Sequence, residues 1–442
     1  MRHVPRWTMF NDSYQRNEVE LWRRWIPQLS TSESAIRHAA IAVGSLLLKH
    51  DASAATPSSL IVSRGATDSF AIHHYQEAIR STLQLIQSGK GDANLAGITC
   101  LLFFSIEALQ GHEYEALQLF ERGGPTHLVP STKSGNSIKN ALADAFSQLS
   151  VQWSMFEGSF VVAHKNSAQL DGEILTSGQA QKELTSLILQ AFNVAAEGLQ
   201  LKWMPRLPPE DPGGNRDGLF EAYKELLLRQ SDIEASLNLW HERFLTYEKT
   251  QTQSADPVWH KIICGMLLLR FQSIQIWLVG SIGRSEMIYD NYLPLIRDAI
   301  SGARDVLDLM EQSGRFALFS SELALIPTLY IIVTKCRDPV LRRAALALLH
   351  RAPMQEGLWN RTIVIQVCER AIDLEEGSDG FIHDLPPEMT EMLVPETMRL
   401  KFIKIELRTT NDDDCRGDFV EFNSLPYGFD GEWCITREFF TV

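Results

Sequence analysis

The chain has 442 residues, of which 45% are hydrophobic and 22% charged, a balance typical of an ordinary soluble globular protein. Its formal net charge is −14, and its Lys and Arg residues form no clustered run. Because duplex binding depends on cations that neutralise phosphates, this composition argues against a module that binds DNA by itself. The first 25 residues contain no hydrophobic run typical of a signal peptide. The longest apolar stretch, residues 324–333, is too short to span a membrane.

Helical periodicity begins early in the chain. A helix pair is predicted within residues 17–50, and its second helix starts at Ser34 with this inner face: Ile36, Ala39, Ala40, Val43 and Leu47. A loop is predicted at 51–67, followed by an amphipathic helix marked by Ile72, Tyr75, Ile79, Leu83 and Ile86. Residues 93–110 are apolar nearly all round, so this helix is expected at the centre of the fold. Another helix starts at residues 114–120.

The helical pattern continues through the middle of the chain. Further helices are predicted at residues 138–156, 180–198, 220–228, 237–247, 259–277, 292–309 and 318–335. The clearest interruption is the stretch at 204–218, which is rich in proline and glycine. It is either a domain boundary or a surface loop within one fold, and we favour the loop.

The end of the chain changes to strand periodicity. In residues 401–407, Ile403, Ile405 and Leu407 alternate with Lys404 and Glu406. A polar turn at 411–414 and strand-like segments at 419–422 and 433–440 follow. The chain therefore predicts an all-α protein, an irregular array of antiparallel helical hairpins with a small C-terminal antiparallel β-element. We expect one helical domain over residues 1–398 and a β-hairpin element over 399–442, packed on it.

No catalytic, cofactor-binding or metal-ligating residue is predicted. Nucleophile-elbow, phosphate-loop, dinucleotide and zinc-protease motifs are absent from the sequence. His73 and His74 point about 100° apart on a helix, so they cannot share a metal as i, i+4 pairs do. His112 and Glu113 lie at a helix junction without the spacing of a di-iron site. We interpret these four residues as structural or surface residues.

The cysteines are interpreted as small buried hydrophobic residues in a reducing compartment. No two of them form a Cys-x2-Cys pair, and four lie within apolar helical patterns. They are Cys100, Cys264, Cys336, Cys368, Cys415 and Cys434.

Residues 336–360, called the signature segment below, carry the strongest local pattern. Asp338 suits a helix N-cap, and Pro339 suits the first helical position because no amide donor is needed there. One apolar face follows with helical spacing, made of Leu341, Ala344, Ala345 and Leu348. Pro353 and Gly357 close this helix before a second one opens near Trp359.

Two interpretations of Arg342, Arg343 and Glu356 are open. They belong to a ligand or partner site, or they form an Arg–carboxylate pair that clamps two helices, where the guanidinium fork suits partial burial. We favour the clamp, which predicts that Glu356→Ala destabilises the fold by leaving a buried guanidinium unpaired. Trp277 and Trp359 are expected to be core residues.

The signature segment resembles the C-terminal motif of the regulatory domain of fungal binuclear zinc-cluster transcription factors. The matching residues are Cys336, Arg337, Asp338, Pro339, Arg342, Arg343, Ala344, Leu348, Leu349, Pro353, Glu356, Gly357 and Trp359. Two further blocks, at 28–39 and 101–117, resemble helices of the same family. The resemblance covers roughly residues 20–375 in order, together with a similar tail.

The resemblance implies a helical regulatory domain and a protein that is not an enzyme and needs no cofactor. The six cysteines are too widely spaced for the zinc cluster of the family, which needs six close thiolates. DNA would therefore be reached only through a segment absent from this chain or through a partner. No heptad run of the kind that mediates dimerisation in the family is visible, although a homodimer stays possible.

The function implied by the resemblance is transcription regulation in the nucleus, of a metabolic or secondary-metabolite gene set. It would act through protein partners of the transcription machinery or a co-regulator, with no membrane association. One alternative is a cytoplasmic, non-enzymatic adaptor that has lost DNA binding. The other is an enzyme on a recruited helical fold, which would need a convergent cluster of His, Asp and Glu in a pocket.

Overall fold

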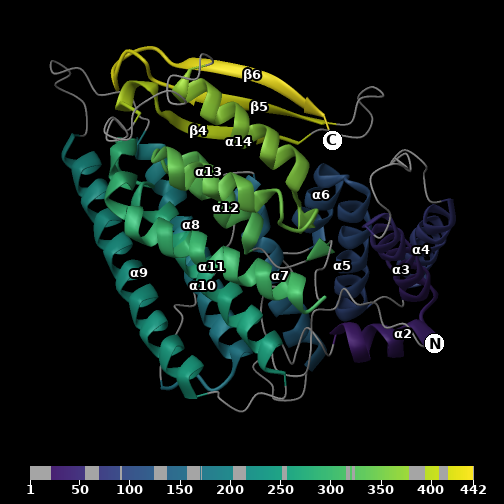
Figure 1. Ribbon diagram of the computed structural model, residues 1–442. Helices are drawn as coiled ribbons and strands as arrows, with labels where there is room; N and C mark the ends of the chain where they lie inside the picture. The colour runs from purple at the N-terminus through teal and green to yellow at the C-terminus, as the bar shows by residue number, and fades with distance from the viewer. Residues whose placement is uncertain are drawn as a thin grey trace.

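The computed structural model describes residues 21–54, 69–89, 92–123, 137–156, 170, 172–202, 216–250, 256–314, 319–320, 324–377, 394–407 and 417–441. These residues form a helical body with a small antiparallel sheet lying across one end of it (Figure 1). The predicted fold class, all-α with a small C-terminal β-element, is confirmed.

The helical elements follow one another along the chain, from the N-terminal residues to the start of the C-terminal sheet. They are η1 (Leu21–Trp25), α2 (Ile26–Ser32), α3 (Ser34–Ala54), α4 (Ser69–Gln87), α5 (Ala93–Gln110), α6 (Glu113–Gly123), α7 (Ser137–Phe156), α8 (Ser177–Lys202), α9 (Arg216–Thr250), α10 (Pro257–Val279), η3 (Glu286–Tyr292), α11 (Leu293–Gln312), α12 (Leu325–Lys335), α13 (Pro339–Leu349), α14 (Arg361–Glu376) and η5 (Glu396–Met398).

Helices that follow one another in the chain pack together, as in α3 with α4, α5 with α6, α8 with α9, and α10 with α11. Figure 1 places α3 and α4 at one edge of the body and α9 at the opposite edge. The apolar side chains form two large clusters. One is built mainly by the elements up to α7, contains Phe146 and includes Leu358 from the turn between β2 and β3; the other is built from α7 onward and contains Val151. Helix α7 thus joins the two halves.

Local signals explain where the central helices begin and end. Asp92 caps α5 by accepting a hydrogen bond from the Leu95 amide at 2.7 Å, and Gly111 ends the helix with φ of 74°. Asp256 caps α10 in the same way, and its carboxylate accepts from the Trp259 amide. By length and composition α5 and α10 could each cross a membrane, but most of each helix is buried inside the body. Such burial is typical of helices in the core of a fold.

Several predicted helices differ from the structure in their bounds. The segments predicted at 220–228 and 237–247 belong to the single helix α9, because the polar residues between them include no helix breaker and Ile233 packs into the core. The helix predicted from residue 318 begins only at Leu325, as α12, and residues 319–320 form a strand. Helix α3 extends to Ala54, into the loop predicted at 51–67.

Helix α4 was predicted to carry an inward apolar face, and this prediction is only partly correct. Ile79, Leu83 and Ile86 are 37%, 52% and 67% exposed, whereas Ala71 and Ala78 are buried. Helix α4 packs closely on α3, and its buried positions are filled by alanines instead of by these larger residues. The rest of the predicted loop at 51–67, the stretch at 204–215, the turn at 411–414 and Cys415 lie outside the described residues.

Two small sheets complete the structure. Strands β1 (Phe319–Ser320), β2 (Gln355–Glu356) and β3 (Trp359–Asn360) form the first, in which β1 is parallel to β2 and β3 antiparallel to it. The second is an antiparallel meander of β4 (Leu400–Glu406), β5 (Gly417–Ser424) and β6 (Cys434–Thr441), with β5 in the middle. The strands predicted at the C-terminal end are confirmed, and one face of this sheet contacts α14.

Candidate functional site

The signature segment lies at the centre of a buried network of charged residues. Glu375, in the last turn of α14, accepts a hydrogen bond from Arg337 at 2.8 Å and from Arg342 at 2.6 Å. All three side chains are fully buried. Burial would raise the pKa of Glu375, but the two guanidinium groups hold it below its usual value. The carboxylate is therefore ionised. It links α14 to α13, which carries Arg342, and to the connection between α12 and α13, which carries Arg337.

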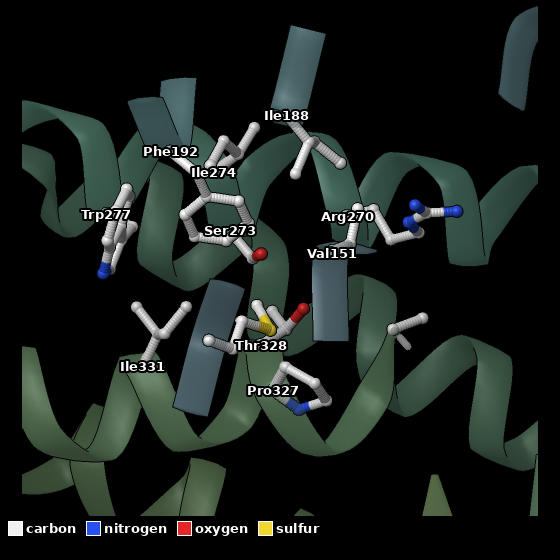
Figure 2. Close-up of a pocket in the computed structure, with 12 residues that line it drawn as sticks. Val151, Ile188, Phe192, Arg270, Ser273, Ile274, Trp277, Pro327, Thr328 and Ile331 are labelled. Carbon is white, nitrogen blue, oxygen red and sulfur yellow. The ribbon is translucent and has the colours of Figure 1, made fainter. Parts of the chain in front are cut away.

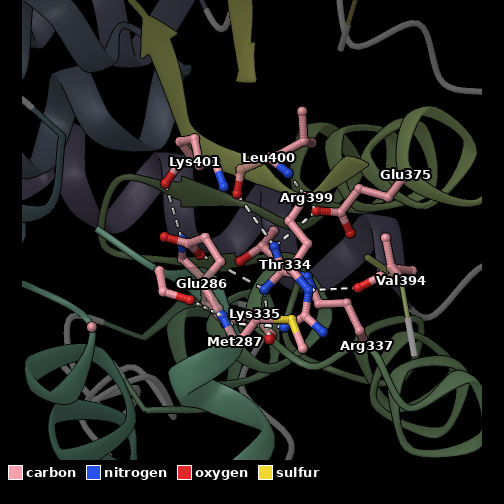
Figure 3. Close-up of polar contacts among 12 residues, drawn as sticks. Glu286, Met287, Thr334, Lys335, Arg337, Glu375, Val394, Arg399, Leu400 and Lys401 are labelled. Carbon is pink, nitrogen blue, oxygen red and sulfur yellow. Dashed lines mark hydrogen bonds and ion pairs between the residues drawn. The ribbon is translucent and has the colours of Figure 1, made fainter. Parts of the chain in front are cut away.

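A second carboxylate, Glu286 of η3, lies beside the first. Its oxygens contact Lys335 Nζ at 2.7 Å, Lys202 Nζ at 3.3 Å and Arg337 Nη1 at 3.8 Å (Figure 3 labels Glu286, Lys335 and Arg337). Burial would raise the pKa of Glu286, but the cations lower it, most strongly Lys335 and then Lys202. Burial lowers the pKa of Lys202 to about 8. Two lysines and one arginine thus share a single ionised group.

The network extends to the strand that enters the C-terminal sheet. Arg399 makes a bidentate pair with Asp290, at 2.9 and 2.7 Å, and its Nε donates to the Val394 carbonyl at 2.7 Å. Lys401 pairs with Glu396, whose carboxylate also accepts from the Glu286 amide at 3.1 Å. The segment before β4 is therefore fastened to η3 by charge-assisted hydrogen bonds.

Local sequence explains why the signature segment can supply these contacts. The Asp338 carboxylate accepts from the amides of Val340 and Leu341, and Pro339 occupies the first turn, so α13 starts as predicted. Arg342 then lies one turn into α13, where its Nε donates to the Val333 carbonyl at 2.7 Å, near the end of α12. One side chain thus caps one helix and pairs with the carboxylate of another.

The favoured interpretation of Arg342 and Arg343 agrees with these contacts, but the partner assumed for them was wrong. Arg342 pairs with Glu375, and Arg343 Nη2 lies 2.5 Å from a carboxylate oxygen of Glu376. Glu356, which is fully buried, instead accepts hydrogen bonds from three backbone amides at the start of α12: Ala324, Leu325 and Ile326. A carboxylate is favoured there because the first amides of a helix carry partial positive charge.

Two of the histidines singled out in the sequence, His74 and His112, contact side chains from other helices. His74 Nδ1 lies 2.7 Å from His38 Nδ1, between α4 and α3. His112 Nδ1 lies 2.7 Å from Glu107, whose other oxygen accepts from the Tyr75 hydroxyl at 2.6 Å. Within the described ranges, no three His, Cys, Asp or Glu side chains come together as a metal-binding group. These contacts link helices to one another.

A small cavity lies where α7, α8, α10 and α12 meet, and Figure 2 shows the side chains around it. Its volume of about 20 Å³ suits about one ordered water and leaves no room for a drug-sized ligand. Trp277 lines it and packs edge-to-face on Phe192, with ring centroids 4.7 Å apart. Trp359 lies deeper and is buried in the main core, as expected.

Among the members of the charged network that sequence reasoning missed are Lys202, Glu286, Glu375 and Arg399. Glu375 and Glu376 follow the helical stretch after Trp359, so a pair of carboxylates at a helix end was a visible signal. The other three lie at the ends of elements far apart in the chain, and no local pattern marks them.

Comparison with known proteins gives one informative similarity. The chain is 21% identical to the aspercryptin biosynthesis cluster-specific transcription regulator atnN of Emericella nidulans, over 82% of this chain and 73% of that protein. No protein-family model matches the chain. No solved structure matches it either. The similarity points to a family of fungal transcription regulators and supports a regulatory role at that level.

Proposed function

We propose that this protein regulates transcription of a metabolic or secondary-metabolite gene set from the nucleus. The observation that carries the proposal is the similarity to a cluster-specific transcription regulator along 82% of the chain. In the signature segment, which carries the resemblance to fungal transcription regulators, the charged residues are structural. Arg337, Arg342 and Glu356 are all fully buried and hydrogen-bonded.

The helical body contacts protein partners of the transcription machinery or a co-regulator. With a net charge of −14 the chain is a poor match for duplex phosphates, so DNA contacts come from a partner or from a separate segment. On this proposal, the contacts that join the helices and the sheet keep the surface that other proteins bind in a fixed shape. The chain performs no catalysis and uses no cofactor.

The test is chromatin occupancy of a tagged copy, combined with transcript profiling of a deletion strain. We expect enrichment at promoters of one gene set and changed expression of the same genes. Complementation with the exposed-surface variant Glu369→Gln should restore expression, and the network variant Glu375→Gln should fail through loss of folded protein. Occupancy at no promoter and unchanged transcripts, together with a stable cytosolic partner, would replace this proposal with the adaptor function.

A further inference from the structure

The two edges of the C-terminal sheet differ in how they are closed. At the β4 edge, side chains of the helical body take up backbone groups: the Leu400 amide donates to Glu375 at 2.7 Å, and Lys335 donates to the Lys401 carbonyl at 3.2 Å. The pairing of β4 with β5 is also irregular between Leu400 and Phe402. Irregular pairing and cover by other parts of the chain both protect a sheet edge from further pairing. The β4 edge is therefore closed.

The opposite edge of the sheet is formed by β6 (Figure 1). This strand pairs with β5 in continuous register from Cys434 to Thr441, with neither a bulge nor a proline. Among the residues that the structure describes, no strand pairs with its other side. In the first half of β6, Cys434, Ile435 and Arg437 are exposed. A regular edge of this kind offers backbone amides and carbonyls to a further strand.

Helix α14 holds β6 in place from one face. Arg370 forms a forked pair with Glu438, with Nη2 at 2.6 Å and Nε at 2.8 Å from Oε1. Gln366 donates to the Thr441 carbonyl at 3.2 Å. The strand is therefore already ordered before anything binds to its edge, which lowers the entropic cost of adding a partner.

The pairing with β5 shows which side chains suit the neighbours of β6. Arg437 lies opposite Glu421, and its Nε atom is 3.7 Å from the Glu421 carboxylate. Phe439 lies opposite Phe419, with ring centroids 5.1 Å apart. The Arg437 side chain is 51% exposed, so a carboxylate on a strand at the outer side can also approach it. Opposite charges directly across a strand pair stabilise it.

A second copy of this chain fits the edge less well. Opposite residues of an antiparallel pair share one face of the sheet, so pairing of β6 with itself about a two-fold axis places one residue opposite itself. In the two registers with the greatest overlap this residue is Arg437 or Glu438. Each register sets like charges directly opposite one another, which destabilises the pair. The edge therefore favours a strand of different sequence.

We propose that the edge of β6 at residues 434–438 binds an extended segment of another protein, which adds to the sheet as an antiparallel strand. Backbone hydrogen bonds supply the affinity, and side chains at alternate positions supply the selectivity. The segment carries an acidic residue opposite Arg437 and, two positions away, an apolar residue opposite Ile435, which is 56% exposed. The inference does not rest on the proposed function, because it follows from the sheet alone.

Amide hydrogen exchange with a defined peptide tests the proposal. The probe is a synthetic peptide with the sequence of residues 417–424, because this strand already pairs with β6 on its other side. In the full-length protein without peptide, we expect every second amide of residues 434–438 to exchange fast. The peptide at about 1 mM should slow these amides about tenfold, as for a dissociation constant of about 0.1 mM, and leave β4 unchanged. If all these amides are protected without peptide, or none is slowed by it, the proposal is overturned.

Two matched charge reversals test the role of Arg437. Arg437 and Lys404 both pair with Glu406, but Arg437 lies on the β6 edge and Lys404 on β4. We expect Arg437→Glu to weaken binding of the peptide about threefold and Lys404→Glu to leave it unchanged. Equal weakening in both variants would mean that the peptide responds to overall charge, and would contradict strand addition at β6. Sedimentation of the native protein as a dimer that Arg437→Glu dissociates would assign the edge to a second copy and overturn the proposal.

Discussion

Arg342 and Glu375 are 33 positions apart in the chain, yet the Arg342 Nη2 atom lies 2.6 Å from a carboxylate oxygen of Glu375, and both side chains are fully buried. The second oxygen of Glu375 serves Arg337. One carboxylate therefore compensates two buried guanidinium groups. Because an uncompensated buried charge costs far more than an exposed one, this residue is the most sensitive point of the network.

Replacing Glu375 by Gln should lower the free energy of unfolding by about 3–5 kcal/mol, because it removes the charge and leaves Arg337 and Arg342 without it. Urea denaturation followed by circular dichroism measures the change. Glu369→Gln on the same helix is the matched control. Glu369 is about half exposed and lies 4.0 Å from His350, so its loss should cost less than about 0.5 kcal/mol. Equal losses for the two variants would show that the buried network stabilises the protein no more than an exposed ion pair does.

For the neighbouring ion pair of Lys202 and Glu286, we expect removal of the cation to change the stability little. In Lys202→Met, Glu286 still contacts Lys335 at 2.7 Å and Arg337 at 3.8 Å, so its charge stays compensated. The variant should stay within about 1 kcal/mol of the native protein at pH 7, because the desolvation cost of a buried ammonium is removed along with its ion pair. Glu286→Gln, by contrast, should lose about 3–5 kcal/mol. A large loss in Lys202→Met would show that this ammonium is needed.

The same lysine makes stability depend on pH. Burial lowers the pKa of Lys202 to about 8 from the ordinary value of 10.5, so between these values the unfolded chain binds more protons than the folded one. Stability contributed by this group therefore rises as the pH increases from 8 to 10.5. The native protein should gain about 2 kcal/mol relative to Lys202→Met over this range. Urea titrations of both proteins at pH 7.5 and 10 measure the difference, and a constant difference would contradict it.

Local patterns predicted the helices and strands well where amphipathic spacing and caps agree. Residues 93–110 became α5 with its predicted bounds, and the alternation at 401–407 became β4. The pattern was misleading in α9, where a polar stretch without Gly or Pro continues the helix. It also misled in α4, where Ile79, Leu83 and Ile86 are exposed while two alanines are buried. Packing between helices decides these cases, and packing is not a local property.

The charged network shows a different limit of prediction from sequence. Asp338 and Pro339 acted as predicted because a cap depends on residues two or three positions away. Glu286 and Lys202, in contrast, are 84 positions apart and meet only in the folded chain. The partner assumed for Arg342 was wrong for the same reason, because its actual partner, Glu375, lies 33 positions away in the chain. Glu356 is nearer in sequence, but the turn between β2 and β3 aims it at the start of α12.

Glu356→Ala should still destabilise the protein, but for a reason that differs from an unpaired guanidinium. It would leave the buried amides of Ala324 and Ile326 without the oxygen that accepts from them at 3.2 and 2.9 Å. We expect a loss of about 2–4 kcal/mol, since each buried amide left unsatisfied costs about 1–3 kcal/mol. Glu356→Gln keeps one acceptor and should recover part of the loss. Thermal unfolding distinguishes the two variants, and an unchanged melting temperature in both would reject the capping role.

Gly357→Ala tests the turn that positions Glu356. Gly357 follows β2 with φ of 57°, a left-handed conformation that is costly for any residue with a Cβ atom, and a Cβ there would collide with the Gln152 side chain. We expect a loss of about 1–3 kcal/mol in urea denaturation. Gly44→Ala is the matched control, because Gly44 lies within α3 and a Cβ there meets nothing within 4 Å. That variant should gain about 0.5–1 kcal/mol, since alanine favours a helix over glycine. If both substitutions stabilise the protein, the turn tolerates a side chain and Glu356 is positioned by other contacts.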